Sequence, residues 1–227
     1  MQTMINKTNI NLSSGELEVV CNKEWIITKH VIIEKVYQLF GTLASSMQQQ
    51  VMHKIDALPK EAGERNPKIS RGENYQSLPY VMLDYPRHFT KESTLAIRTF
   101  FWWGNFFSIN LHLAGTCKQI AIPALLANFA FMQQRGYWLC VHANAWQHHF
   151  EGDNYKLLED YTATDFATIL YGKPFIKIAK FIPLRQWDAA PVFLQTHFNE
   201  MMWLLQVNFP AGEKGLLPGI PTTGSGL

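Results

Sequence analysis

The stretch that decides the fold is residues 93–115, with the sequence STLAIRTFFWWGNFFSINLHLAG. Two runs rich in aromatic and β-branched residues flank Gly104 and Asn105. A Gly-Asn pair between alternating runs favours a β-hairpin, because both residues adopt the positive φ angles of a two-residue loop at low cost. The sequence therefore predicts two antiparallel strands joined by a tight turn at residues 104 and 105.

A two-residue loop also determines which side chains share a face of this hairpin. In that register Arg98 lies opposite Leu111, on a face that is otherwise apolar. The other face carries Asn110 and His112 beside aromatic side chains, because side chains alternate between the two faces of a strand. We expect the apolar face to pack in the core, and the amphipathic face to line a pocket or lie beneath a loop.

Three long helices are predicted from apolar residues that recur every three or four positions. The clearest helix spans residues 30–58 and is ended by Pro59. The second spans residues 119–135, and Gly136 is placed to end it in the left-handed conformation. The third spans residues 188–207, where apolar side chains again form one stripe.

Further strands are expected where β-branched and aromatic residues dominate, at residues 17–27, 80–85, 137–146 and 174–184. The central hairpin excludes an all-parallel sheet, because its two strands must run in opposite directions. The predicted class is therefore α+β. We expect an antiparallel sheet of four to six strands around the hairpin, with the long helices packed on one face.

The chain of 227 residues, 47% of them hydrophobic, is long enough to bury a sizeable core in one domain. We expect that domain to span residues 1–210, with a loose arm at residues 1–15. Residues 211–227 are rich in glycine and proline and predict an extended or disordered tail. Residues 60–79 are polar and rich in turn formers, which predicts a long connection, and connections of this length are often functional.

Charge and composition argue against several classes of partner. The formal net charge is +2, from 20 basic and 18 acidic residues without blocks of like charge, so neither nucleic acid nor an anionic membrane is an expected partner. The first residues lack the pattern of a signal peptide, and three scattered cysteines suit reduced thiols. A cytoplasmic protein is the expectation. Phosphate-loop, dinucleotide and nucleophile-elbow motifs do not occur, so we expect no cofactor and leave open whether the protein is an enzyme.

The strongest candidates for function are polar residues near the hairpin. Arg98 stands out, because an arginine on an apolar sheet face needs a carboxylate or an anionic ligand to offset its desolvation. Asp84 is the obvious internal partner, and a purely structural ion pair is the alternative. The predicted ligand-binding residues are Arg71, Arg87, Arg98, Asn110 and His112.

A second hypothesis is a metal-dependent enzyme. Residues 140–153 are rich in cysteine, histidine and carboxylate side chains, which zinc or iron accepts as ligands. The expected ligands are Cys140, His142 and His148, although no standard metal-site spacing occurs and the simpler interpretation is one partly buried strand histidine with two solvated histidines in a turn.

The leading hypothesis remains a protein that binds a small molecule or a protein partner through the amphipathic face of the hairpin and residues 60–79. A third hypothesis is a homodimer formed through the aromatic turn at residues 103–106.

The chain resembles one family of uncharacterised bacterial proteins, the YktB-like family. The resemblance includes Arg71 and Gly72, Tyr75, Pro79 before an alternating strand, and the aromatic strand pair. It also includes the segment FIKIAKFIPLRQWDAA, which precedes the last helix. Where that family has a Pro-His-Phe-Gln strand start, this chain has Pro-Tyr-Val-Met, so the polar pair of the family is missing. The resemblance implies an α+β fold and no particular activity.

Overall fold

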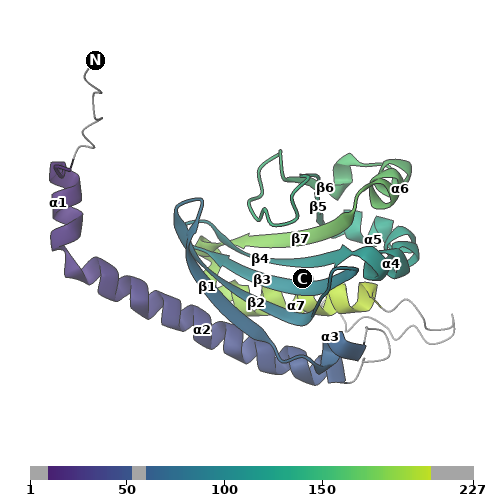
Figure 1. Cartoon of the computed structure of the whole chain (residues 1–227), viewed down its shortest axis with the longest axis horizontal. Helices are drawn as coiled ribbons and strands as arrows, with labels where there is room; N and C mark the ends of the chain where they lie inside the picture. Colours follow the sequence, from purple (N-terminus) through teal and green to yellow (C-terminus); the bar gives the residue numbers. More distant parts are fainter. Residues whose placement is uncertain (1–9, 53–59, 206–227) are drawn as a thin grey trace, which may run out of the picture.

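The computed structural model describes residues 10–52 and 60–205, and within them seven strands form one antiparallel sheet. The strand order is β1-β2-β3-β4-β7-β5-β6, and helices cover one face of the sheet (Figure 1). The predicted α+β class and the antiparallel sheet are confirmed, although the sheet has more strands than expected. Among the described residues, no helix combines the length and the hydropathy of a membrane-spanning segment.

The elements, in chain order, are α1 (Ser14–Cys21), α2 (Lys23–Met52), α3 (Lys60–Glu64), β1 (Lys68–Tyr75), β2 (Leu78–Phe89), β3 (Ser93–Trp102), β4 (Phe106–Ala114), α4 (Gly115–Ala127), α5 (Phe129–Gln134), β5 (Trp138–Cys140), β6 (Tyr155–Leu157), the 3₁₀ helix η2 (Leu158–Asp160), α6 (Ala163–Gly172), β7 (Phe175–Pro183), the 3₁₀ helix η3 (Leu184–Ala189) and α7 (Ala190–Leu204). Strands β1 to β4 follow one another as neighbours, and β7 then extends the sheet beside β4.

The central hairpin forms as predicted, but its loop has three residues and its register differs by one position. Trp102 is paired with Phe106, and the amide of Asn105 donates to the carbonyl of Trp102 at 3.0 Å. Gly104 takes a φ of 75° at the third position of this turn, where a positive φ is needed. Arg98 therefore lies opposite Asn110 rather than opposite Leu111.

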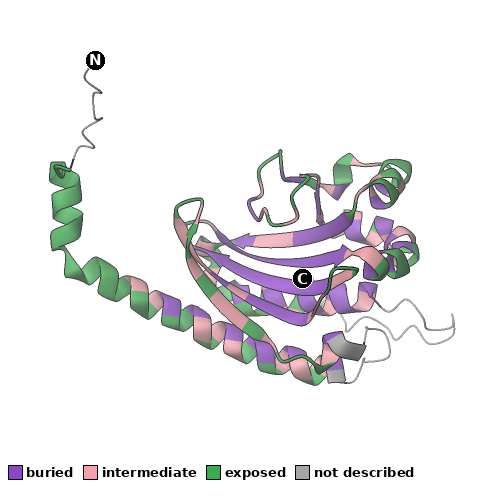
Figure 2. Cartoon of the chain, in the orientation of Figure 1, coloured by how far each residue is buried: buried purple, intermediate pink, exposed green. Residues whose placement is uncertain are grey.

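The corrected register changes the composition of both faces. Arg98, Asn110 and His112 share one face of the sheet, whereas the prediction placed Arg98 on one face and Asn110 and His112 on the other. The other face is apolar and packs against α2, α4 and α7 in the main core, as the contact of Phe107 with Phe40 at 6.3 Å between ring centroids illustrates. Figure 2 shows that the central strands are buried along most of their length.

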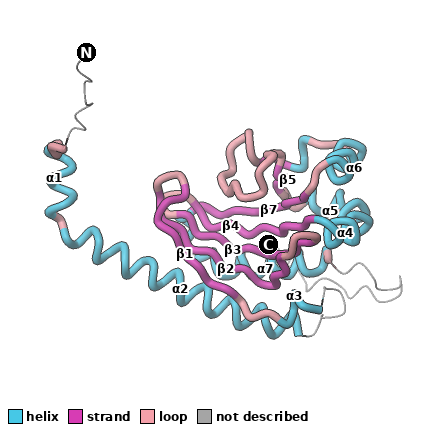
Figure 3. Tube along the Cα trace, viewed as in Figure 1, coloured by secondary structure: helices cyan, strands magenta, loops and turns pink. Residues whose placement is uncertain are grey.

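The face that carries Arg98 is covered by residues 141–154, which we call the covering loop. It has no regular secondary structure and leaves the sheet after β5 as a loop (Figure 3). Its two ends are joined by a hydrogen bond of 2.8 Å from the amide of Val141 to the carbonyl of Asn154. His148 of this loop stacks on Phe100 of β3, with ring centroids 4.7 Å apart. Phe150 packs edge-to-face on Phe106 of β4. The predicted strand at residues 137–146 is thus wrong beyond Cys140, because the chain leaves the sheet there to cross over it.

Two further predictions from composition are wrong. The strands expected at residues 17–27 are helical, and a capping box that Ser13 forms with Glu16 begins α1. Residues 60–79, expected to be a connection, contain α3 and β1. β1 is polar because it is the edge strand of the sheet and most of its side chains are partly or fully exposed.

The helix predictions hold with shifted bounds. α2 covers the predicted helix but starts earlier, and residues 53–59 lie outside the described residues, as does the end of the third predicted helix. The second predicted helix is divided into α4 and α5 at Asn128, and Gly136 adopts the expected positive φ of 64°. The tail at residues 211–227 and the first nine residues of the predicted arm also lie outside the described residues.

Two glycines provide a matched test of the fold. A Cβ atom at Gly115 would lie 1.8 Å from the carbonyl oxygen of Glu92, and Gly115 has a φ of 57°, so Gly115→Ala should lower the free energy of unfolding by on the order of 3 kcal/mol or more. Gly41 lies within α2, and a Cβ atom added there would have no other atom within 4 Å. Gly41→Ala should therefore raise the free energy of unfolding by up to about 1 kcal/mol. Urea unfolding followed by circular dichroism measures both changes. A Gly115→Ala protein as stable as the parent would contradict the close approach.

Candidate functional site

The candidate site consists of polar side chains that lie in two neighbouring rows across the covered face of the sheet. Asp84, Arg98 and Asn110 are cross-strand neighbours on β2, β3 and β4 and form the first row. His112 and Lys177 are neighbours on β4 and β7 and form the second. All five side chains are buried. Burial of charged groups is unusual unless they are paired.

Arg98 and Asp84 form a two-pronged ion pair inside the protein. Nε of Arg98 donates to one carboxylate oxygen of Asp84 at 2.7 Å, and Nη2 donates to the other at 2.9 Å. The side-chain amide of Asn110 donates to the backbone carbonyl of Arg98 at 3.3 Å. The structure thus contains the internal partner that the sequence suggested for Arg98, and most of the guanidinium is already engaged. Removing either partner would leave a buried charge unpaired.

Lys177 is the charged side chain on this face that lacks a carboxylate partner within the described residues. It is 1% exposed, and Nζ donates to the backbone carbonyls of Ala145 at 2.9 Å and Gln147 at 2.6 Å. Nζ also lies 5.3 Å from the centre of the Tyr155 ring. Burial, together with the nearby positive charge of Arg98, lowers the pKa of Lys177 to about 8.

Two histidines beside this lysine are held in the neutral form. Burial lowers the pKa of His112 to about 3, and the positive charges of Lys177 and Arg98 add to the effect. Burial also lowers the pKa of His148 well below its usual value, and each charged group that acts on this ring is basic. Nη1 of Arg98 lies 3.5 Å from Nε2 of His148, which can only accept from it. The proton of His148 is then on Nδ1, which is buried and has no hydrogen-bond partner in the described residues.

The covering loop closes this face through an exposed aromatic side chain. Trp146 is 54% exposed, yet its ring lies 5.5 Å from the guanidinium carbon of Arg98 and 5.7 Å from the His112 ring. The loop is held to the body by Lys177, and by Tyr75, whose hydroxyl oxygen accepts from the amides of His148 and His149. The segment around Trp146 therefore lies between the buried basic side chains and the solvent.

The predicted ligand-binding residues have different locations. Arg98, Asn110 and His112 come together on the covered face. Arg71 is exposed and pairs with Val81, whose side chain packs in the helix-side core, so Arg71 does not join them. Arg87 lies near the end of β2, where its Nε donates to the carbonyl of Asn66 at 3.0 Å.

The sequence analysis missed Lys177 and Trp146. A signal for Lys177 was present, because it alternates with Phe175, Ala179 and Phe181 on one face of a strand and is the one charged residue among them. Trp146 had no comparable signal, because its position over Arg98 depends on the path of an irregular loop.

The predicted metal ligands do not converge. Sγ of Cys140 donates to the side-chain oxygen of Asn154 at 3.4 Å, and Nδ1 of His142 accepts from the amide of Asn144 at 2.9 Å, while His148 faces Arg98. Burial raises the pKa of the Cys140 thiol, which disfavours the thiolate form that binds metals.

Another group in the same loop does converge. Side-chain ligand atoms of His149, Glu151 and Asp153 lie within 4.8 Å of one another, the one such group of three in the described residues. The hydroxyl oxygen of Tyr75 and Nε2 of Gln76 each lie 3.1 Å from Nδ1 of His149. The other ring nitrogen, Nε2, then faces Asp153 and lies 3.2 Å from its Oδ1.

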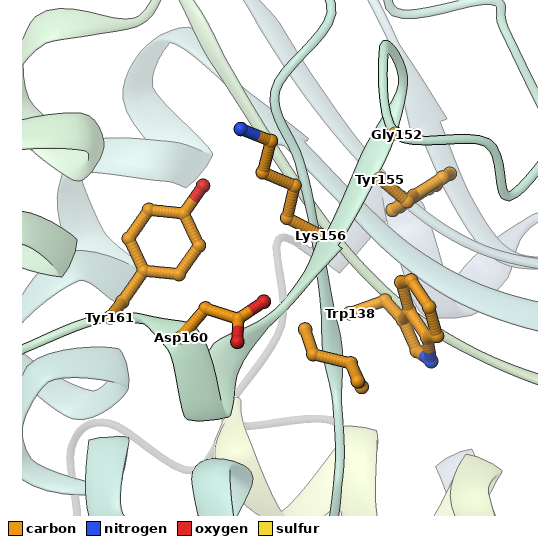
Figure 4. A pocket seen from close by; sticks show the side chains of 7 residues that line it. Trp138, Gly152, Tyr155, Lys156, Asp160 and Tyr161 are labelled. Atoms are coloured by element: carbon orange, nitrogen blue, oxygen red, sulfur yellow. The ribbon is translucent and has the colours of Figure 1, made fainter.

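An open pocket of about 490 Å³ lies at the outer edge of the sheet, along β6 (Figure 4). It is lined by Trp138, Gly152, Tyr155, Lys156, Leu157, Asp160 and Tyr161. None of the predicted ligand-binding residues lines it. In Figure 4 the side chains of Lys156 and Tyr161 lie on one side of the β6 ribbon and those of Trp138 and Tyr155 on the other. The pocket is therefore a depression beside an edge strand, and the ring of Tyr155, which also lies beside Lys177, is its link to the covered face.

A second polar cluster, centred on Glu200, lies on the helix side of the sheet. Glu200 of α7 accepts hydrogen bonds from Tyr137 at 2.7 Å, from His197 at 2.7 Å and from Arg135 at 2.9 Å. Burial alone would raise the pKa of Glu200, but these partners lower it to about 2. Since the carboxylate is fully engaged, this cluster ties α7 to the segment before β5 and has a structural role.

The aromatic turn proposed for dimerisation is largely packed within the protein. Phe106 is buried against Phe150 and Phe181, and Trp103 is partly buried against the helix-side core. Little aromatic surface remains exposed there.

Comparisons of the chain with protein-family models, with curated proteins and with solved structures found no match. The resemblance to the YktB-like family therefore stays a prediction, and the function has to be inferred from the site itself.

The neutral state of His112 predicts how stability depends on pH. Between its native pKa of about 3 and an unfolded value near 6.5, the unfolded chain binds a proton that the native chain does not, so stability falls as the pH falls. His112 alone should account for a loss of about 2 kcal/mol between about pH 7 and about pH 5. In His112→Gln this loss should be smaller than in the parent by that amount, as measured by urea unfolding at both pH values.

His30 provides the control, because its side chain is exposed on α2. His30→Gln should show the pH dependence of the parent. Equal acid losses in His112→Gln and the parent would mean that His112 is already charged in the native protein.

Proposed function

We propose that the protein binds a small anionic ligand on the covered face of the sheet, beneath the covering loop. The observation that carries this proposal is Lys177, a fully buried ammonium group without a carboxylate partner in the described residues. Burying a charge without a counter-ion is costly, and proteins keep such groups mainly where a ligand or a reaction needs them.

The balance of charge on this face supports an anion rather than a cation. Asp84 is the buried carboxylate of the strands on this face, and Arg98 already neutralises it, while Glu151 and Asp153 of the covering loop are exposed and lie beside His149. Nδ1–H of His148 has no acceptor in the described residues, and two of the three N–H donors of Lys177 are held by backbone carbonyls of the covering loop rather than by a counter-ion. Lys173 lies beside them, and its Nζ donates to the carbonyls of Cys140 and His142 at 3.3 and 2.7 Å.

The covering loop supplies a route to these groups. Both carbonyls that accept from Lys177 belong to residues 145 and 147, so a shift of this short segment would release the ammonium group and uncover the face at once. Trp146, between them, is positioned to stack on a planar ligand. In this arrangement Lys177 binds the anion and Asn110 and His112 line the site. Arg98 holds their strands in place, whereas Arg71 and Arg87 take no part.

Thermal unfolding in the presence of inorganic phosphate or citrate tests the proposal, with sodium chloride at matched ionic strength as reference. An anion that binds only the native state, present at a concentration of about ten times its Kd, should raise the free energy of unfolding by about 1.4 kcal/mol. Lys177→Met should abolish this stabilisation. Lys91→Met, at an exposed position in the β2–β3 turn, should keep it.

The comparison between the two lysine variants decides the outcome. If neither anion stabilises the parent more than chloride does, or if both variants respond as the parent does, the covered face is not an anion site.

The second candidate function, a metal-dependent activity, is favoured by one observation, the convergence of His149, Glu151 and Asp153. One imidazole and two carboxylates form a ligand set that zinc or manganese accepts. If a metal binds there, Glu151→Gln together with Asp153→Asn should weaken the affinity for Zn²⁺ by more than about tenfold in calorimetric titration, because both carboxylates lose their charge. Glu159→Gln, an exposed change in η2, is the control and should leave the affinity unchanged. Absence of zinc binding by the parent would remove this candidate.

A further inference from the structure

The N-terminal arm, here residues 10–31, is helical from Ser14 onward except at Asn22, and it stands away from the rest of the protein. Figure 1 shows α1 and the first turns of α2 projecting beyond the sheet, and Figure 2 shows that they are exposed. Each of residues 10–28 is exposed. An ion pair between Lys29 and Glu73 lies where α2 reaches the body, and burial of α2 begins at Ile33.

The arm is nevertheless rich in large apolar side chains. Nine of them are between 49% and 89% exposed: Ile10, Leu12, Leu17, Val19, Val20, Trp25, Ile26, Ile27 and Val31. Ile26 lies seven positions before Ile33 and so extends the buried stripe of α2 into the solvent. Val31, two positions before Ile33, points to the other side of the helix. Trp25, Ile26 and Ile27 follow one another and so spread over more than half of the circumference of α2. Apolar side chains on so wide a face are normally buried, and nothing in the described part of the chain covers them here.

We propose that a second copy of this chain covers the arm, so that two arms pack against each other in a symmetric dimer. The apolar area is sufficient. At about 60–120 Å² per fully exposed side chain, nine side chains that are roughly half exposed offer on the order of 500 Å² per copy. A standard interface buries about 800 Å² per partner, of which somewhat more than half is apolar.

The shape of the arm also suits self-association. The angle between α1 and α2 forms an open groove of about 480 Å³, where Val19, Val20 and Ile26 supply apolar surface and Glu16, Asn22 and Lys23 supply polar groups. A symmetric interface brings the same surface of both copies together, so the Trp25 side chain of one copy can enter this groove of the other. Large aromatic side chains that fill such grooves are the usual anchors of protein interfaces.

The charges of the arm favour another copy over a lipid surface. The arm carries Glu16, Glu18 and Glu24 against Lys23 and Lys29. A helix that binds an anionic membrane is rich in lysine and arginine on its polar side, which this one is not. In an antiparallel pair of arms, by contrast, Lys23 of each copy would lie near Glu16 and Glu18 of the other, whereas Lys29 already pairs with Glu73 of its own chain.

Light scattering coupled to gel filtration of the full chain tests the dimer. The parent should have twice the mass of the 26.1 kDa chain, and the variant with both Val20→Glu and Ile26→Glu should have the mass of the monomer. Val192→Glu places the same charge on an exposed valine of α7 and should remain dimeric. Circular dichroism should show that the double variant keeps its folded body, because neither residue contacts it.

Cross-linking provides a second readout that does not depend on a destabilising change. Cys21 is exposed in the arm, whereas Cys117 and Cys140 are buried. A short thiol cross-linker should join two chains of the parent, and Cys21→Ser should abolish that product. A monomeric parent, or a double variant that stays dimeric, overturns the proposal. If the parent is monomeric and binds vesicles containing phosphatidylserine, the arm is a lipid-binding element instead.

Discussion

The structure depends on the register of the β3–β4 ladder, which the turn between Trp102 and Asn105 determines. Side chains alternate between faces, so a slip of one residue would move every side chain of one strand to the wrong side of the sheet. In the observed register one set of alternating apolar residues of both strands faces α2 and α7, while Arg98, Asn110 and His112 lie on the covered face together with the aromatic side chains of Phe100 and Phe106. One additional loop residue thus separates an apolar core from a polar interior on the two sides of the same hairpin.

The polar interior is stable because each charge has a specific compensation, although the compensations differ in kind. Arg98 is neutralised by a carboxylate on the neighbouring strand, which is part of the sheet itself. Lys177 is compensated by two peptide carbonyls of an irregular loop and by the face of the Tyr155 ring, not by a carboxylate. His112 and His148 avoid the cost of burial by remaining neutral. The least firmly compensated charge therefore lies under the least regular part of the protein, and this coincidence is what distinguishes the site from an ordinary core.

The sequence predicted those features that depend on local periodicity. The hairpin, most of α2, α7 and β7 have apolar repeats that leave little choice of element, and the α+β class follows from them. The predicted register was wrong because Gly104 and Asn105 suit a two-residue loop and a three-residue loop equally. The strand β1 was not predicted because an edge strand needs no apolar face. The prediction of strands at residues 17–27 was wrong because it gave more weight to their β-branched residues than to the capping box at Ser13. For the site, Lys177 was visible as a charge in an apolar strand, but the covering loop brings distant residues together and leaves no periodic signal.

The two carbonyls that hold Lys177 have a consequence for how tightly the proposed site would bind an anion. They occupy the positions that an incoming acceptor would take, so the covering loop acts as an internal competitor. Any affinity is reduced by the free energy of closing the loop. Substitutions that loosen the loop without touching the ligand would therefore strengthen binding, and occupancy would open this part of the protein rather than close it.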